Sequence, residues 1–247
     1  MTTHPFPEIE PEVTVVPRPE AELREVLRTD AGGFFVPLEV GAETKWSFYD
    51  WPDRKLTNVS LTRVVGPMRY RGEDCLEVVD TIISGADEEW WSRWFYLVKD
   101  ETMTWLAREG HWSRPPRFTE ADVTPWPLRL RPGLRWEGHE IYRCGAEEEG
   151  VGDRSCGAVE GPFGVTVPAA THLCLRESWW TYRADGTPNT MAEVYVAESG
   201  RSIYFRRFNG PAWRNYEELG KAGVPEREFE GVVWRLWYEC LPEIALG

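Results

Sequence analysis

The sequence predicts an all-β protein with minor helices, built on a curved antiparallel sheet of about ten strands. Apolar and polar residues alternate with period two in segment after segment, and glycine, proline, aspartate and asparagine separate these segments. Aromatic residues make up 13% of the chain, which favours strands and argues against disorder. Fourteen of the 247 residues are tryptophan, so we expect an aromatic core or an aromatic binding surface.

The expected strands follow one another from residue 44 to residue 208, and one more lies near the end of the chain. They span residues 44–50, 58–66, 74–84, 90–98, 102–108, 139–144, 157–167, 171–183, 190–198, 201–208 and 231–240. Two short helices are expected outside this run. Residues 20–29 place Leu23, Val26 and Leu27 on one stripe before two glycines, and residues 212–221 place two aromatic rings on one side.

A faint internal duplication indicates how the strands are grouped. Val64-Val65-Gly66-Pro67 recurs as Val159-Glu160-Gly161-Pro162, and a strand with a cysteine and then a tryptophan pair follow in both places. We therefore predict two similar halves, over about 35–108 and 139–208. Two such halves would face one another as a half-barrel or a two-sheet sandwich.

The remaining segments complete the expected domain organisation. Residues 1–18 are rich in proline and are expected to form an extended arm. Residues 19–247 would then be a single β domain. Within it, the proline- and tryptophan-rich stretch 109–138 is expected to cross from one half to the other.

Charge and cysteine content restrict the compartment and the partners. The formal net charge of −13 argues against nucleic acid and against an anionic membrane surface as partners. No apolar run approaches 18 residues, and the first residues lack the basic and apolar regions of a signal peptide. Five widely spaced cysteines are typical of reduced thiols. These observations predict a cytoplasmic protein.

Two short motifs resemble a largely uncharacterised group of bacterial all-β proteins. Val36-Pro37-Leu38-Glu39-Val40-Gly41, followed by Trp46-Ser47-Phe48-Tyr49, resembles their Pro-Leu-x-x-Gly opening and aromatic strand. Val167-Pro168-Ala169-Ala170-Thr171-His172, then Cys174 and residues 193–197, resembles their Val-Pro-Ala-Gly-Thr-Phe segment and Glu-x-Tyr-x-Ala strand. The resemblance covers residues 35–207 and implies a curved sheet similar to the periplasmic lipoprotein-carrier half-barrel. Ala170 and His172 depart from the glycine and phenylalanine of the motif.

Two strands carry the candidate ligand-binding residues. One face of strand 171–183 combines hydrogen-bonding groups with aromatic rings, a mixture that suits a cavity wall; its candidates are His172, Arg176, Trp180 and Tyr182. The other face of this strand, with Leu173, Leu175, Glu177 and Trp179, is expected in the core. Strand 90–98 adds Trp94 and Tyr96. The alternatives are a solvent-facing surface for the first strand and plain core packing for the second.

The sequence contains no motif for metal, cofactor or nucleophile chemistry. It has no Cys-x-x-Cys or His-x-x-x-His pair, no phosphate-binding glycine loop and no nucleotide fingerprint. His172 and Cys174 share one strand face, but nothing in the sequence would stabilise a thiolate. We therefore expect no metal and no cofactor, and assign no catalytic residue.

Three functions from different classes agree with these observations. The first is a non-catalytic binding or scaffold protein that holds an apolar or aromatic small molecule in a sheet lined by tryptophan and tyrosine. The second is a cofactor-independent enzyme of the isomerase or cyclase type that uses the same cavity, because preorganised groups can catalyse without a recognisable motif. The third is a protein–protein interaction module with tryptophan anchors. A deep cavity would favour the first two, and the first is our prediction.

Overall fold

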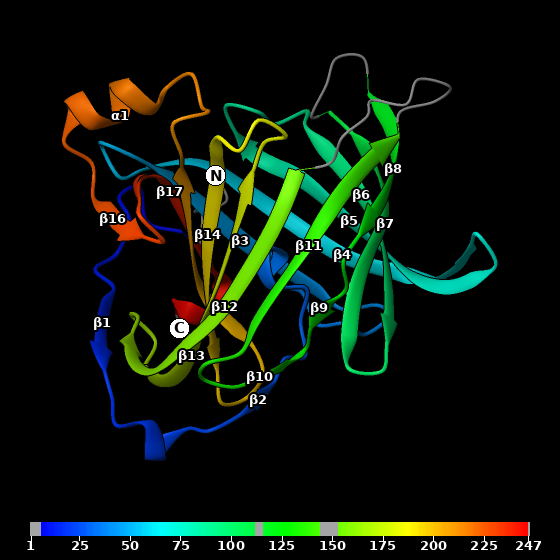
Figure 1. The fold of residues 1–247 in the computed structure, drawn as a ribbon, viewed down its shortest axis with the longest axis horizontal. Helices are drawn as coiled ribbons and strands as arrows, with labels where there is room; N and C mark the ends of the chain where they lie inside the picture. The colour runs from blue at the N-terminus through cyan, green and yellow to red at the C-terminus, as the bar shows by residue number, and fades with distance from the viewer. Residues whose placement is uncertain (1–5, 112–115, 144–152, 247) are drawn as a thin grey trace, which may run out of the picture.

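The strands form one antiparallel sheet that closes on itself as a barrel (Figure 1). The computed structural model describes residues 6–111, 116–143 and 153–246. The twelve barrel strands are β3 (Glu43–Asp50), β4 (Lys55–Tyr70), β5 (Glu73–Gly85), β6 (Trp91–Lys99), β7 (Thr102–Gly110), β8 (Arg117–Val123), β11 (Arg135–Arg143), β12 (Asp153–Thr166), β13 (Thr171–Tyr182), β14 (Pro188–Ala197), β15 (Ser202–Asn209) and β17 (Val232–Pro242).

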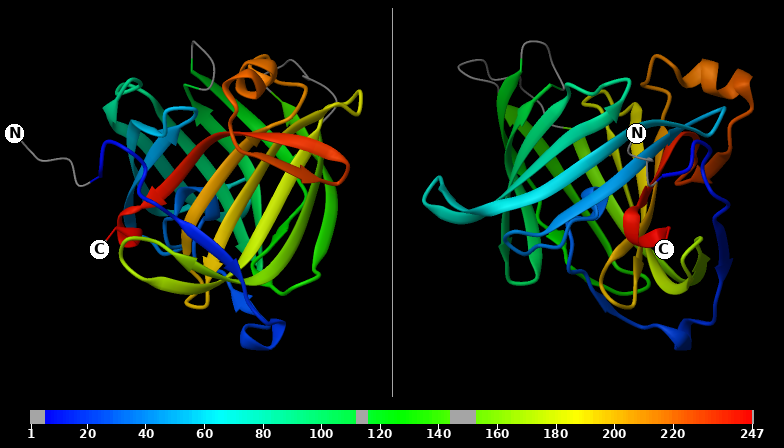
Figure 2. Two further views of the ribbon diagram at one scale, coloured as in Figure 1. Left: turned by 90° about the vertical axis from the view of Figure 1, so that its left-hand side faces the viewer. Right: turned by 180° about the vertical axis from the view of Figure 1, so that it is seen from behind.

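The order of the strands around the barrel is β12-β11-β8-β7-β6-β5-β4-β3-β17-β15-β14-β13. A further pairing of β12 with β13, from Arg154 opposite Tyr182 to Thr166 opposite Thr171, closes the ring. β4 and β5 are the longest pair and extend past the barrel wall as a bent hairpin (Figures 1 and 2). Two register shifts in this pair increase its bend, as β-bulges do.

The closed ring corrects the predicted architecture. The all-β class and the antiparallel sheet are confirmed, but the sheet is neither a half-barrel nor a two-sheet sandwich of ten strands. One cause lies in the stretch 109–138, which was expected to be a crossover. It contains β8, which occupies a place in the wall between β7 and β11. The prolines and tryptophans around β8 conceal its alternating pattern in the sequence.

Short elements surround the barrel. β1 (Thr14–Pro17) pairs with β12, β16 (Glu226–Phe229) pairs with β17, and β9 (Trp126–Pro127) pairs with β7. The predicted helix over 212–221 is present as α1 (Tyr216–Ala222). Within the described residues, no helix is long and apolar enough to cross a membrane.

The helix predicted over residues 20–29 does not form. A 3-10 turn spans Glu20–Glu22, and β2 (Val26–Leu27) then pairs with β10 (Arg129–Leu130). Leu23 and Val26 pack into the apolar cluster of the barrel interior, together with Leu130 and Leu175. Burial in an extended conformation therefore overrides the local preference for a helix.

The chain from residue 28 to residue 36 enters the barrel and fills one end of its interior (Figure 2). Buried Asp30 accepts hydrogen bonds from the backbone N–H of Ser202, at 2.6 Å, and from its hydroxyl, at 2.9 Å. Arg28 forms a buried ion pair with Glu177 of β13. Phe35 is fully buried against Trp46, with ring centroids 5.7 Å apart. These contacts fix the segment inside the barrel.

The outer wall is also covered on the side of β12 to β15 and β17. Val13 and Val15 of the N-terminal arm pack against a cluster that contains Tyr195 and Tyr204. Phe229 of β16 packs edge-on against Trp180, with centroids 4.9 Å apart. Strands on this side are therefore buried on both faces, unlike a sheet with one face in water.

Candidate functional site

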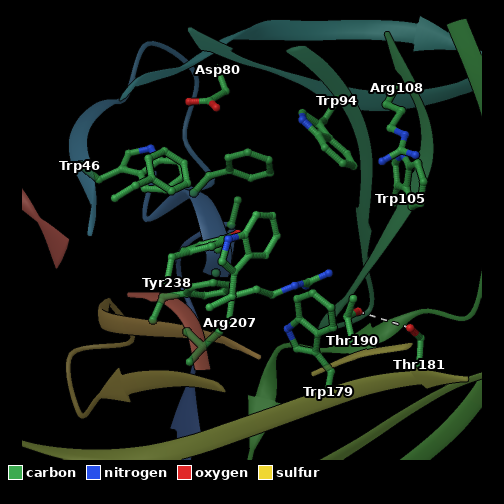
Figure 3. Close-up of a pocket in the computed structure, with 18 of the residues that line it drawn as sticks. Trp46, Asp80, Trp94, Trp105, Arg108, Trp179, Thr181, Thr190, Arg207 and Tyr238 are labelled. Carbon is green, nitrogen blue, oxygen red and sulfur yellow. Dashed lines mark hydrogen bonds between the residues drawn. The ribbon is translucent and has the colours of Figure 1, made fainter. Parts of the chain in front are cut away.

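The barrel encloses a cavity of about 610 Å³, which lies in the size range of small-molecule sites (Figure 3). The segment that contains Gly32, Gly33 and Phe34 lines its closed end. Its other end is lined by loop residues, which include Trp90 and the exposed Asp87 beyond β5 and Trp213 before α1. The cavity therefore reaches the surface at that end of the barrel.

Aromatic rings form a large part of the cavity wall. Among the described residues, eight tryptophans line it, namely Trp46, Trp90, Trp94, Trp105, Trp126, Trp179, Trp213 and Trp237. A continuous belt of neighbouring rings runs around the interior: Phe205, Tyr238, Phe48, Trp46, Phe34, Trp94, Trp105 and Tyr142. Successive centroids in this aromatic belt are 4.3–6.3 Å apart. Such a wall offers broad apolar contact and ring faces for stacking.

Each carboxyl group of the cavity has a hydrogen-bond donor or a cation beside it. Asp80 accepts from the hydroxyls of Ser60, at 2.5 Å, and Thr62, at 2.7 Å. Glu140 accepts from the Tyr142 hydroxyl. The other pairs are Asp50 with Thr57, Asp87 with Asn58, Asp153 with Asn189, and Glu177 with Arg28.

Burial raises the pKa of several of these carboxyl groups. It raises the pKa of Asp80 to about 6, against the opposing effect of the two hydroxyl donors. Burial also raises the pKa of Asp50, Glu140 and Asp153 above the ordinary range of their side chains. The interior is consequently less anionic than its count of acidic residues indicates.

Two arginines project into the cavity with their guanidinium groups against ring faces. Arg108 lies 5.0 Å from the ring centroid of Trp105 and 5.3 Å from that of Trp94. Arg207 of β15 lies 4.9 Å from the ring centroid of Trp179. Figure 3 shows the Arg207 side chain directed toward the middle of the cavity and the Arg108 side chain beside Trp105 at the wall. Cation–π contact of this kind stabilises a partly desolvated guanidinium.

The structure places the six predicted ligand-binding residues on two different sides of the barrel wall. Trp94 and Tyr96 line the cavity. His172, Arg176, Trp180 and Tyr182 lie on the outer face of β13, and none of them lines it. On that face Trp180 is buried under Phe229, and Arg176 pairs with Glu160 at 3.0 Å. Their role in ligand binding stays a prediction.

The cavity residues of β13 belong to the strand face that was expected to be core. Glu177, Trp179 and Thr181 line the cavity from this strand. Arg207, Glu140 and Trp126 also line the cavity, although they were not among the predicted site residues. Arg207 could have been found from its place in the alternation of the strand 201–208, two residues after Phe205 on the same face.

Within the described ranges, no group of three histidine, cysteine, aspartate or glutamate side chains could hold a metal ion. Four cysteines, Cys75, Cys156, Cys174 and Cys240, are buried free thiols. Burial raises the pKa of the Cys174 thiol to about 12. Cys144 lies outside the described residues.

Two solved bacterial structures are similar to this chain at low sequence identity. One, from Bacteroides fragilis, is provisionally described as an exported protein with a YmcC-like fold. It is 14% identical and has a TM-score of 0.41, with 85% of this chain and 97% of that chain covered. The other, from Parabacteroides distasonis, is provisionally described as a lipoprotein. It is 10% identical, with a TM-score of 0.38 and coverages of 87% and 98%. No protein-family model and no curated protein matches the chain.

These comparisons affect two predictions. The predicted cytoplasmic location is not supported: one of the two proteins is described as exported and the other as a lipoprotein. The resemblance to the lipoprotein-carrier group is supported only as a similarity to bacterial proteins described in these terms. Its two sequence motifs are not confirmed.

Proposed function

We propose that this barrel is a binding protein whose interior holds an apolar or aromatic small molecule. The observation that carries the proposal is the cavity of about 610 Å³ with eight tryptophans in its wall. Large rings fixed by their neighbours provide contact area at little cost in conformational entropy. The rings surround an interior space and do not gather on an outer face, which supports a ligand over a protein interface.

Neighbouring tryptophans on β13 allow a matched test of this proposal. Trp179 lines the cavity and Trp180 lies on the outer face of the same strand. We expect N-phenyl-1-naphthylamine, a neutral aromatic probe, to bind with increased fluorescence and with quenching of tryptophan emission. Trp179→Leu should weaken this binding about three- to tenfold, because it removes one stacking face.

Trp180→Leu is the control, and it should leave the affinity within about twofold even if it lowers stability through lost contact with Phe229. Far-UV circular dichroism of both variants verifies that the barrel is folded. The opposite pattern, with affinity lost in Trp180→Leu and kept in Trp179→Leu, would place the ligand on the outer face of β13. Failure of the wild-type protein to bind the probe would contradict an apolar binding cavity.

A second candidate is a cofactor-independent enzyme of the isomerase or cyclase type, and one observation favours it. Glu140 has a pKa raised by burial and accepts a hydrogen bond from Tyr142 inside the cavity. A raised pKa brings a carboxyl group closer to the range in which it can serve as a general acid. Mass spectrometry of the small molecule that copurifies with the protein separates the two functions. Conversion by the wild type, together with unchanged binding but no conversion by Glu140→Gln, would support the enzyme.

A further inference from the structure

Arg207 differs from the other charged groups of the cavity, because no ion pair or hydrogen bond to it exists within the described part of the chain. Its contact is the stacking of the guanidinium on Trp179, at 4.9 Å. A guanidinium is an obligatory hydrogen-bond donor with five N–H groups, and it stays charged inside proteins. Removing such a group from water without an anionic partner is costly. The fold therefore directs a cation without an ion-pair partner among the described residues into a cavity lined by many aromatic rings.

No carboxyl group among the described cavity residues forms an ion pair with Arg207. Burial lowers the pKa of its guanidinium, and Glu140 attracts it at longer range and acts to raise that pKa. Glu177 pairs with Arg28, and Asp80 is held by Ser60 and Thr62. Asp87 is exposed at the open end and lies beside Asn58. Asp50, Glu140 and Asp153 each have a neutral donor, and burial favours the protonated form of these three acids. None of them lies within ion-pair distance of the Arg207 side chain.

Indole N–H groups of the wall have the same unsatisfied donor character. The Nε1 atoms of Trp105 and Trp213 are buried and find no acceptor among the described residues. Both tryptophans line the cavity, and Trp105 belongs to the aromatic belt. These two groups without partners are hydrogen-bond donors, whereas each carboxyl group of the cavity has a donor or a cation beside it. Because these two indole nitrogens have no exposed surface, the donor that a ligand in the cavity can reach is the partly exposed Arg207, and its guanidinium calls for acceptor oxygen atoms on the ligand.

We propose that the ligand is an amphipathic anion, in which a carboxylate pairs with Arg207 and an aromatic or aliphatic body lies against the aromatic belt. This inference rests on the proposed binding function and specifies its ligand class. Arginine suits the role because its planar fork binds a carboxylate through two parallel hydrogen bonds. Trp179 holds the plane of the guanidinium from one side and so leaves its edge directed toward the cavity.

A pair of probes that differ only in the terminal group, a carboxylate in one and a hydroxyl in the other, tests this inference. Pyrene-1-butyric acid and pyrene-1-butanol share the ring system and the chain length, and energy transfer from the cavity tryptophans to pyrene reports their binding. We expect the wild-type protein to bind the acid about ten- to a hundredfold more tightly than the alcohol. Arg207→Met keeps the length of the side chain and removes its charge, so it should bring this ratio to about one while the affinity for the alcohol stays within about threefold.

Two further variants make the result specific. Arg207→Lys keeps the charge but loses the fork, and it should restore part of the preference for the acid. Arg154→Met removes an arginine that stacks on Tyr182 at the outer face of the barrel, and it should leave the ratio unchanged. Binding of the alcohol by Arg207→Met verifies that the variant is folded with an open cavity.

The outcomes separate this inference from the function on which it rests. Equal binding of acid and alcohol by the wild type, or a preference that survives Arg207→Met, overturns the anionic ligand and leaves the binding function in place. Absence of binding for both pyrene probes overturns the binding function and the ligand class together. An acid preference that disappears in Arg207→Met alone supports both.

Discussion

At the scale of single residues, Asp80 connects the cavity to the pH dependence of stability. Its carboxyl group is almost fully buried, and burial raises its pKa from 3.8 to about 6. The folded state therefore binds the proton more tightly than the unfolded chain does. The stability that this group contributes is complete below about pH 4 and is lost as the pH rises through about 6.

Asp80→Asn should remove this pH-dependent loss. Because the amide stays neutral and its oxygen can still accept from Ser60 and Thr62, we expect the variant to be more stable than the wild type by about 2–3 kcal/mol at pH 8. The two proteins should be equally stable near pH 4. Urea unfolding at several pH values measures the difference. Asp74→Asn, at an exposed position of the same strand, is the control and should give the same small difference at every pH.

At the scale of elements, a buried ion cluster attaches β16 to the barrel wall. Glu193 of β14 is fully buried and pairs with Arg227 of β16, with Arg206 at 3.5 Å and with Arg176 at 3.7 Å. Removing the shared carboxylate would leave three cations close together in a desolvated site. We expect Glu193→Ala to lower the free energy of unfolding by about 3–5 kcal/mol, as measured by urea titration.

Glu226 provides the matched comparison for this cluster. It lies on β16 itself and pairs with Arg235 at 2.9 Å, but its side chain is half exposed. Surface pairs of this kind contribute little, so Glu226→Ala should cost less than about 1 kcal/mol. Equal losses in Glu193→Ala and Glu226→Ala would show that the burial of Glu193 has no energetic consequence.

The strands themselves show how far the sequence alone could predict the site. The alternation of apolar and polar residues predicted the bounds of β13 to within a residue or two. It also placed Trp179 and Trp180 on opposite faces of this strand, as the structure does. The alternation could not identify which face of β13 meets the cavity. The N-terminal arm and β16 cover the outer face of this strand, so both of its faces are buried. Arg176 on the outer face was therefore predicted to bind a ligand. In the structure its guanidinium forms ion pairs with Glu160 and Glu193. On β6, Trp94 and Tyr96 line the cavity, and their predicted role in ligand binding stays a prediction.

At the scale of the whole molecule, closure of the barrel depends on contacts that a local pattern cannot encode. The strand lengths and turns indicated a curved sheet, whereas the pairing of β12 with β13 and the insertion of β8 decide that the sheet is a ring. The predicted halves, 35–108 and 139–208, are joined along β8–β11 on one side, and β3 and β15 each pair with β17 on the other. Either half alone would expose two unpaired edges. We therefore expect the barrel to unfold as one cooperative unit.

Gly157→Ala tests this cooperativity from within one half. The ring of Trp136 on β11 lies over Gly157 on β12, so a methyl group there would overlap the ring. We expect a loss of about 1–3 kcal/mol from overpacking. Gly164→Ala, on the same strand, has its nearest neighbour at 3.5 Å on the Arg18 side chain and should change stability by less than about 1 kcal/mol. In urea, far-UV circular dichroism follows the secondary structure of the whole sheet, and tryptophan fluorescence follows the tertiary packing around the fourteen tryptophans. Gly157→Ala should move both curves to the same lower midpoint, because closure couples the halves. A biphasic curve in which the substitution shifts only one phase would instead show two independently folding halves.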